Sequence, residues 1–379
     1  MLVQSPVASD TRVIREATTL AASGKDVHIV GRDVPDDFVP PAGVTVESVP
    51  RARGLRPEGE RPAHDSIPVR AARWLLLPEH RARVENAWTK AAGTLLAAGP
   101  RPDVVHAHDF NTLELAAELT EMWKVPLVYD SHELWFGRAL PGRPTPVRRR
   151  RGEELEQRLA ADARIVLTVS QGIADRLRRG GLPDVRVVRN TFPIADVTVA
   201  GPSGPPRGLV YAGRIGAGRD LETVVEASAR LAPLRTLLVG PVDAGFHLRL
   251  ADGVEVKPAL SLDQVDVVYR DLGVAVVPLA DRCDNHRLAL PNKLFHAVRA
   301  GVPVVAADLP AIRDVVRDHR VGTLFRPGDA GSLVDAVREL VSNYPEHVQA
   351  VRAAQRALSW DVDSRVLIGA YRDLMGDNG

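Results

Sequence analysis

Residues 209–219 read LVYAGRIGAGR, a short apolar run followed by a turn that contains three glycines and two arginines. The apolar run predicts a buried β-strand, and the pattern after the turn predicts a helix. Glycine lets a backbone approach a ligand closely, while Arg214 and Arg219 can hold phosphate oxygens with permanent charge. A solvent-exposed turn with solvated arginines fits the same residues, because glycine spacing alone is a weak signal.

Strand-like and helix-like segments alternate along the whole chain. This order predicts parallel sheets covered by helices on both faces, so the expected fold class is α/β. The first half has predicted strands at residues 26–30, 44–49, 103–107, 126–130, 164–170 and 185–189, and helices at 11–22 and 151–161. The second half has predicted strands at 208–212, 236–239, 254–257, 274–278 and 303–306, and helices at 221–231, 293–299 and 333–341.

A chain of 379 residues exceeds one ordinary core and suits two domains. Residues 191–207, TFPIADVTVAGPSGPPR, are dense in proline and glycine and predict an interdomain linker. The expected domains are therefore residues 1–190 and 208–360, with the segment 361–379 forming a terminal helix. Only residues 1–4 remain for the opening strand, which predicts either a short strand or a start codon assigned too late. Ligands of open α/β sheets bind beyond the carboxyl ends of the strands, so polar residues at those ends predict a cleft between the two domains.

Composition narrows the possible partners. The 49 Lys and Arg residues balance 48 Asp and Glu residues, so the net charge of +1 gives no indication of nucleic-acid binding. Cys283 is the only cysteine, which excludes an internal disulfide and favours a cytoplasmic location. No apolar run approaches the roughly 20 residues of a membrane span, so membrane contact would be peripheral at most. The arginine run 148–151 could touch anionic lipid, although such runs are commonly solvated.

A second motif, residues 290–305, reads LPNKLFHAVRAGVPVV. Lys293 and His296 are three positions apart and should share one face of a helix. Near a helix start, Lys293 would add a cation to a phosphate that the free backbone N–H groups already attract. The alternative is a solvated lysine and a histidine whose hydrogen bonds are satisfied within the domain.

Taken in order, these motifs resemble the family-four retaining glycosyltransferases, the group 1 enzymes of the GT-B superfamily. The resemblance runs over nearly the whole chain, and an ordered series is more specific than any one motif. It is carried by SDTRVIREA at 9–17, DVVHAHD at 103–109, YDSHE at 129–133, LTVS at 167–170, VRN at 188–190, the turn 213–219, Gly240-Pro241 and the block 291–303.

The resemblance implies two doubly wound, Rossmann-like domains that face a central cleft. It implies transfer of a sugar from a UDP- or GDP-linked donor, with retention, to an acceptor that is a small molecule, lipid or glycan. The first domain would bind the acceptor and the second the nucleotide sugar, and no metal or further cofactor is expected. Relatives also lead us to expect the terminal helix to cross back to the first domain.

The same resemblance assigns roles to residues of this chain. The expected catalytic residues are His132, Arg214, Arg219 and Lys293. The expected donor-binding residues are Gly213, Gly216, Gly240, Lys257, Pro258, Asn292 and His296. Expected acceptor or sugar contacts are Asp10, Arg12, His108, Asp109, Asp130 and Glu133. For Asp130 and Glu133, capping of the following helix is an equally good interpretation.

Two positions depart from the family pattern. Relatives carry two glutamates spaced eight positions apart in this block. The later one, which binds the ribose, aligns with His296, and the earlier one aligns with Leu288. Asp284, Asn285 and His286 could supply polar contacts in place of Leu288. These departures keep a second hypothesis open, a degenerate, noncatalytic GT-B protein that binds a sugar nucleotide or a partner.

Two further patterns bear on metals. His106 and His108 would face one way on a strand and could ligate zinc, but no third ligand with suitable spacing is evident. Asp361 precedes Asp363 at the start of the terminal helix, where Asp361 is expected to be the N-cap. The sequence therefore predicts no metal site.

Overall fold

The computed structural model describes residues 1–49, 87–139, 146–182, 184–194, 201–202 and 204–376. Its first sheet has seven parallel strands in the order β3-β2-β1-β4-β5-β6-β7. The order reverses between β1 and β4, which places the topological switch point there. The strands are β1 (Leu2–Pro6), β2 (Val27–Arg32), β3 (Val44–Ser48), β4 (Val105–His108), β5 (Leu127–Ser131), β6 (Ala163–Thr168) and β7 (Val185–Val187).

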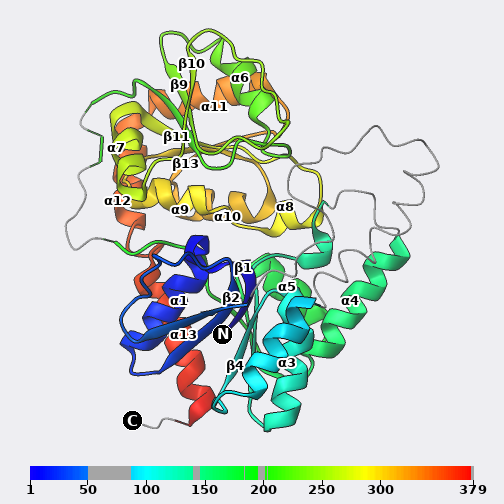
Figure 1. Cartoon of the computed structure of the whole chain (residues 1–379). Helices are drawn as coiled ribbons and strands as arrows, with labels where there is room; N and C mark the ends of the chain where they lie inside the picture. Colours follow the sequence, from blue (N-terminus) through cyan, green and yellow to red (C-terminus); the bar gives the residue numbers. More distant parts are fainter. Residues whose placement is uncertain (50–86, 140–145, 183, 195–200, 203, 377–379) are drawn as a thin grey trace.

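Helices and two short 3-10 turns surround this sheet (Figure 1). The first helix begins where the Asp10 carboxylate accepts a hydrogen bond from the Val13 amide at 3.2 Å, and the Ser170 hydroxyl accepts one from the Ile173 amide in the same way. The elements are η1 (Val7–Ser9), α1 (Thr11–Ala22), α3 (Phe110–Trp123), η2 (Trp135–Gly137), α4 (Pro146–Ala160) and α5 (Gln171–Arg179).

The second sheet has six parallel strands in the order β10-β9-β8-β11-β12-β13. They are β8 (Gly208–Ala212), β9 (Arg235–Val239), β10 (Val254–Lys257), β11 (Gly273–Val277), β12 (Val304–Ala307) and β13 (Gly322–Phe325). The helices of this half are α6 (Leu221–Ser228), α7 (Leu262–Leu272), α8 (Asp284–Leu288), α9 (Asn292–Arg299), α10 (Pro310–His319), α11 (Ala330–Ser342) and α12 (Tyr344–Ala354).

The last helix, α13 (Trp360–Met375), packs on the first sheet and runs along the lower domain in Figure 1. The Trp360 indole donates a hydrogen bond to the Thr19 hydroxyl at 2.8 Å, and Arg189 pairs with Asp363 at 3.0 Å. Ser359 is the N-cap residue of this helix, so the prediction that Asp361 caps it is wrong. The apolar face of α13 buries Leu367 and Tyr371 in the first domain, and this burial anchors the end of the chain there.

The predicted fold class is confirmed: two parallel α/β sheets form two Rossmann-like halves. The opening strand, β1, spans five residues, as many as β3 and β5, so the expectation of a short strand is wrong. The strand β13 was not predicted, because Gly322 and Thr323 leave only two apolar residues in its four-residue sequence. Among the described residues, no helix has the length and apolarity needed to cross a bilayer.

Candidate functional site

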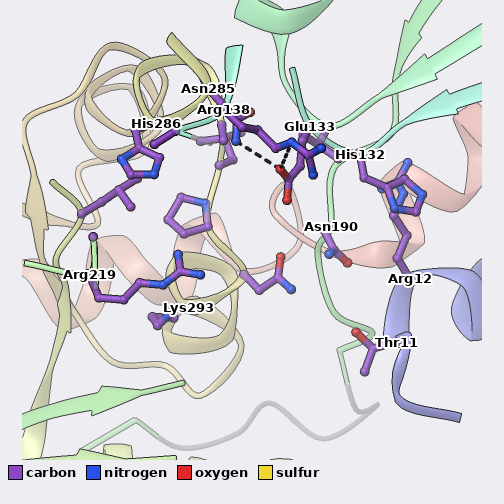
Figure 2. Close-up of a pocket in the computed structure, with 18 of the residues that line it drawn as sticks. Thr11, Arg12, His132, Glu133, Arg138, Asn190, Arg219, Asn285, His286 and Lys293 are labelled. Carbon is purple, nitrogen blue, oxygen red and sulfur yellow. Dashed lines mark hydrogen bonds and ion pairs between the residues drawn. The ribbon is translucent and has the colours of Figure 1, made fainter. Parts of the chain in front are cut away.

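A cavity of about 760 Å³ lies between the two halves, beyond the carboxyl ends of their strands (Figure 2). The first half contributes the start of α1 and the loop after β5, and the second half contributes the turn after β8, helix α8 and the start of α9. Its polar and charged lining side chains are Ser5, Ser9, Asp10, Thr11, Arg12, His132, Glu133, Arg138, Asn190, Arg219, Arg282, Asn285, His286, Asn292 and Lys293.

Charge is divided unevenly between the two walls. Arg219, Arg282 and Lys293 line the wall of the second half with no acidic residue among its described lining side chains, whereas Arg12 and Arg138 of the first half share their wall with Asp10 and Glu133. Figure 2 shows Arg219 and Lys293 on one side, with Arg12 and His132 across from them. The wall of the second half is therefore suited to an anion.

Lys293 reaches the cavity from the first turn of α9, past the glycine-rich turn. A Cβ atom on Gly213 would lie 2.6 Å from Lys293 Cε, so only glycine leaves room for this side chain. Burial, followed by the charge of Arg219, lowers the pKa of Lys293 to about 7. The lysine is thus poised to gain a proton when an anion arrives.

On the opposite wall, His132 lies against two carboxylates. Its Nε2 is 2.9 Å from Asp130 Oδ2, and its Nδ1 is 3.4 Å from Asp109 Oδ2. Burial alone would lower the pKa of His132, but the charges of Asp109 and then Asp130 outweigh it and raise the pKa to about 10. His132 is therefore a cation at neutral pH.

Arg12 holds Asp130 in place behind His132. Its Nε and Nη2 donate hydrogen bonds to the two carboxylate oxygens at 2.9 and 2.8 Å. Burial would raise the pKa of Asp130, but Arg12 and then His132 hold it well below its usual range. Asp130 is fully buried, so it acts on the cavity only through His132.

The structure brings seven of the residues expected from the sequence to this cavity. They are Asp10, Arg12, His132, Glu133, Arg219, Asn292 and Lys293. Ten others do not line it: His108, Asp109, Asp130, Gly213, Arg214, Gly216, Gly240, Lys257, Pro258 and His296. His108, Asp109 and Asp130 surround His132 instead of facing the cavity as the expected acceptor contacts would.

Arg214 corrects one expectation. Its side chain is 67 % exposed and pairs with Asp243, so Arg214 and Arg219 do not converge on one site. Asp243 is held in place because its loop hydrogen-bonds to the turn: the Ile215 amide donates to the Pro241 carbonyl at 2.8 Å, and the Asp243 amide donates to the Ile215 carbonyl at 2.9 Å.

The predicted donor-binding glycines serve this contact between loops. A Cβ atom on Gly216 would lie 2.0 Å from the Asp243 carboxylate, and one on Gly240 would lie 2.1 Å from the Gly213 carbonyl oxygen. Gly240 also donates a backbone hydrogen bond to the Lys257 carbonyl at 3.0 Å, at the end of β10. Close approach of the Asp243 side chain to Gly216, and of the Gly213 backbone to Gly240, therefore accounts for these two glycines without a ligand.

His296 corrects a second expectation. It is buried between the rings of Phe192 and Tyr269, and its Nε2 lies 2.8 Å from Asp266 Oδ1. This face of α9 packs on α7, whereas Lys293 at the start of the helix remains open to the cavity. Sharing a helix face with Lys293 therefore does not bring His296 to the cavity.

Asn285 on α8 is a cavity residue to which sequence reasoning gave no definite role, although its segment was named as a source of polar contacts. Its Oδ1 accepts a hydrogen bond from the Leu134 amide at 2.9 Å, and its Nδ2 donates to Glu133 at 3.4 Å. Leu288 on the same helix packs on Gly172 of the first half, and its carbonyl accepts a hydrogen bond from Ser170. Helix α8 thus joins the two halves at the edge of the cavity.

Replacing Asn285 with alanine should weaken this junction. The buried Leu134 amide would lose its acceptor, at a cost of about 1–3 kcal/mol in the free energy of unfolding. Urea unfolding measures the cost, and small-angle scattering should show a larger radius of gyration as the halves separate more easily. Asn343→Ala, at an exposed helix end, is the control. Equal stability of the two variants would show that the contact across α8 does not hold the halves together.

Comparison with known proteins identifies the family. Residues 9–191 match the model of a glycosyl transferase 4-like domain, and residues 206–343 match the model of the glycosyl transferases group 1. The chain belongs to the group 1 glycosyltransferases. This glycosyltransferase is 24% identical over 363 residues to a glycogen synthase of Mycobacterium tuberculosis (strain ATCC 25618 / H37Rv). The alignment covers 92% of this chain and 85% of that protein. It is 26% identical over 313 residues to a D-inositol 3-phosphate glycosyltransferase of Geodermatophilus obscurus, covering 71% of this chain and 66% of that protein.

Solved structures agree on the architecture of this glycosyltransferase. Sucrose-phosphate synthase from Thermosynechococcus elongatus superposes with a TM-score of 0.74 at 19% identity, over 99% of this chain and 98% of that one. HepE from Anabaena in complex with UDP superposes with a TM-score of 0.65 at 14% identity, over 98% of each chain. At these identities the likeness concerns the fold, which is GT-B in this glycosyltransferase as well.

Proposed function

We propose that this glycosyltransferase moves a sugar from a UDP- or GDP-linked donor to an acceptor hydroxyl, with retention of configuration. The observation that carries the proposal is the cavity itself, with Arg219 and Lys293 on the wall of the second half and the acidic groups of the first half across from them. The solved structures of HepE with UDP and with UDP-glucose support a uridine donor for a protein of this fold.

The donor diphosphate would bind to the wall of the second half. Helix α9 begins there with no side chain capping its free amides, so its N-terminus attracts phosphate oxygens. Lys293 and Arg219 would add two cations as the bond to the sugar breaks and negative charge develops on the leaving group. The protein itself would therefore neutralise that charge, and no metal ion would be needed beside the diphosphate.

The acceptor would enter from the first half. Asp10 and Glu133 line that wall and can accept hydrogen bonds from hydroxyl groups. The His132 cation lines the same wall, where its charge can stabilise the sugar oxygens or a departing phosphate oxygen. Closure of the two halves, joined at α8, would exclude water from the reaction.

A screen of UDP, GDP, ADP and TDP by calorimetry and thermal shift tests the donor site. We expect one of them to bind, and release of that diphosphate from its sugar conjugate once an acceptor is supplied. Binding of none of the four would overturn the donor site.

The second hypothesis is a noncatalytic relative that binds the nucleotide sugar alone. It is favoured by one observation: His296 is buried away from the cavity and Leu288 packs between the halves, so neither position offers a carboxylate to the donor. Firm nucleotide binding without release of the diphosphate, across a broad panel of acceptors, would select this hypothesis.

The donor site should take up a proton when it binds a diphosphate above neutral pH. With a pKa of about 7 the free lysine is largely neutral at pH 8, and a bound diphosphate favours its charged form, so uptake should approach about 0.9 proton. Affinity should accordingly fall as pH rises above 7. Calorimetry at pH 8 in buffers of different ionisation enthalpy measures the uptake. Lys293→Arg, permanently charged, should abolish it, and an unchanged uptake in that variant would assign the proton to another group.

A further inference from the structure

Four buried side chains converge behind His132, on α1, β4 and β5. They are Glu16, His106, His108 and Asp130, and one ligand atom of each lies within 4.8 Å of those of the others. None is more than 1 % exposed, and none lines the cavity between the halves. The cluster lies behind the cavity wall, and His108 and Asp130 contact His132, which lines the cavity.

Several polar atoms of this cluster have no hydrogen bond. Nε2 of His106 and Nε2 of His108 have no partner, and neither oxygen of Glu16 accepts one. The Glu16 carboxylate has only ion contacts, with Arg12 Nη2 at 3.0 Å and with His106 Nε2 at 3.9 Å. Buried polar groups normally have partners, because leaving them unsatisfied costs free energy. So many unpaired polar atoms in one buried cluster indicate that the cluster binds a ligand.

The outer nitrogens of the two histidines are already engaged. His106 Nδ1 is 2.8 Å from the Tyr371 hydroxyl, and His108 Nδ1 lies 3.4 Å from Asp130 Oδ2, which can accept its proton. The two rings stack with centroids 4.2 Å apart and planes 16° apart. A histidine that binds a metal through one ring nitrogen usually has the other fixed by a hydrogen bond, and both rings meet that condition.

The two carboxylates differ in spare capacity. Asp130 already accepts hydrogen bonds from Arg12 and His132, whereas Glu16 accepts none. Glu16, His106 and His108 therefore form a His₂Glu set, a set that binds zinc in proteins, and an oxygen of Asp130 would be the fourth ligand. Arg12 Nη2 lies 3.0 Å from Glu16 Oε1 and 2.8 Å from Asp130 Oδ1, so it balances charge on both carboxylates.

We propose that Glu16, His106, His108 and Asp130 bind one divalent transition-metal ion, with zinc as the preferred ion. Imidazole together with carboxylate suits zinc and its first-row neighbours better than magnesium or calcium. Zinc bonds of about 2.0–2.2 Å would draw the ligand atoms closer together than they lie in the apoprotein. The ion would join α1 to β4 and β5 and would stabilise the first half.

Metal uptake by the whole chain tests the site directly. Protein carrying no polyhistidine tag is dialysed to equilibrium against Zn²⁺ or Co²⁺ and its metal content is measured. We expect about one ion per chain, and visible absorption of Co²⁺ typical of a low-symmetry nitrogen and oxygen site. Thermal unfolding should shift upward with Zn²⁺ and return after chelation, because a ligand of the folded state stabilises it.

Variants locate the ion. His106→Gln and Glu16→Gln should each lose the bound metal, while His247→Gln, on an exposed loop, should retain it. Folded wild-type protein that takes up less than about a tenth of an ion per chain overturns the site, as does full retention of metal by both variants. If the variants do not fold, the uptake and the chelator-reversible shift of the wild type decide alone. Nucleotide binding is not part of this readout, so the proposed transfer reaction can fail without affecting it.

Discussion

Lys293→Ala should weaken binding of the nucleoside diphosphate by about 1.5–3 kcal/mol, which is roughly a tenfold to 150-fold rise in Kd. The lysine reaches the cavity beside the first turn of α9, where a charged hydrogen bond to a phosphate would be partly shielded from water. Release of the diphosphate should fall further than binding, because the charge that Lys293 meets grows as the bond to the sugar breaks. Calorimetry gives the first quantity, and initial rates of release give the second.

Two arginines in the same turn make this experiment discriminating. Arg219 lines the cavity, so Arg219→Ala should match the loss seen for Lys293→Ala. Arg214 is mostly exposed and pairs with Asp243, so Arg214→Ala should cost less in affinity. A loss at Arg214 as large as that at Lys293 would mean that this arginine leaves Asp243 and turns to the diphosphate when the donor binds.

Arg287→Ala is the charge-matched control, since Arg287 is exposed, pairs with Asp281 and does not line the cavity. Its removal should leave affinity within a factor of about two, as expected for a screened surface charge. Unchanged affinity in both Lys293→Ala and Arg219→Ala would place the diphosphate elsewhere in the chain.

Asp130→Asn should lower the free energy of unfolding by about 3–5 kcal/mol, because it leaves the buried Arg12 cation without its main counter-charge. The same change removes one of the two carboxylates that keep His132 charged, so sugar transfer should fall as well. Asp263→Asn is the matched control, because Asp263 is 89 % exposed in its pair with Arg299. The control should change stability by less than about 0.5 kcal/mol.

The stability difference between wild type and Asp130→Asn should depend on pH in two directions. The folded-state pKa of Asp130 is held low, so its contribution is present above its usual value of 3.8 and is lost as pH falls through the depressed pKa. The folded-state pKa of His132 is raised, so its contribution is complete below 6.5 and is lost as pH rises through about 10.

The difference should thus be largest between about pH 5 and 6.5 and shrink toward both extremes. Urea unfolding of chelator-treated protein at several pH values measures it without any contribution from a bound metal. A difference that is the same at every pH would show that packing, and not charge, makes Asp130 important.

The sequence alone determined the fold class and the two halves. Helix α1 and strand β8 have the predicted bounds, 11–22 and 208–212, because hydrophobic periodicity and turn residues act over a few neighbouring positions. The same local logic placed His132 after a strand, Arg219 in a glycine-rich turn and Lys293 at a helix start, and all three line one cavity. These features could be predicted without knowing which helix or strand packs on which.

Only the tertiary structure decided what faces what. Arg214 turns to Asp243 because the loop after β9 packs on the turn after β8, and His296 is buried because α7 covers its side of α9. Glu16 reaches His106 and His108 only because α1 packs against strands that follow much later in the chain. Local periodicity indicates that one face of a helix or strand is buried. Which element buries it depends on the strand order and the crossover connections, because these bring residues far apart in the sequence into contact.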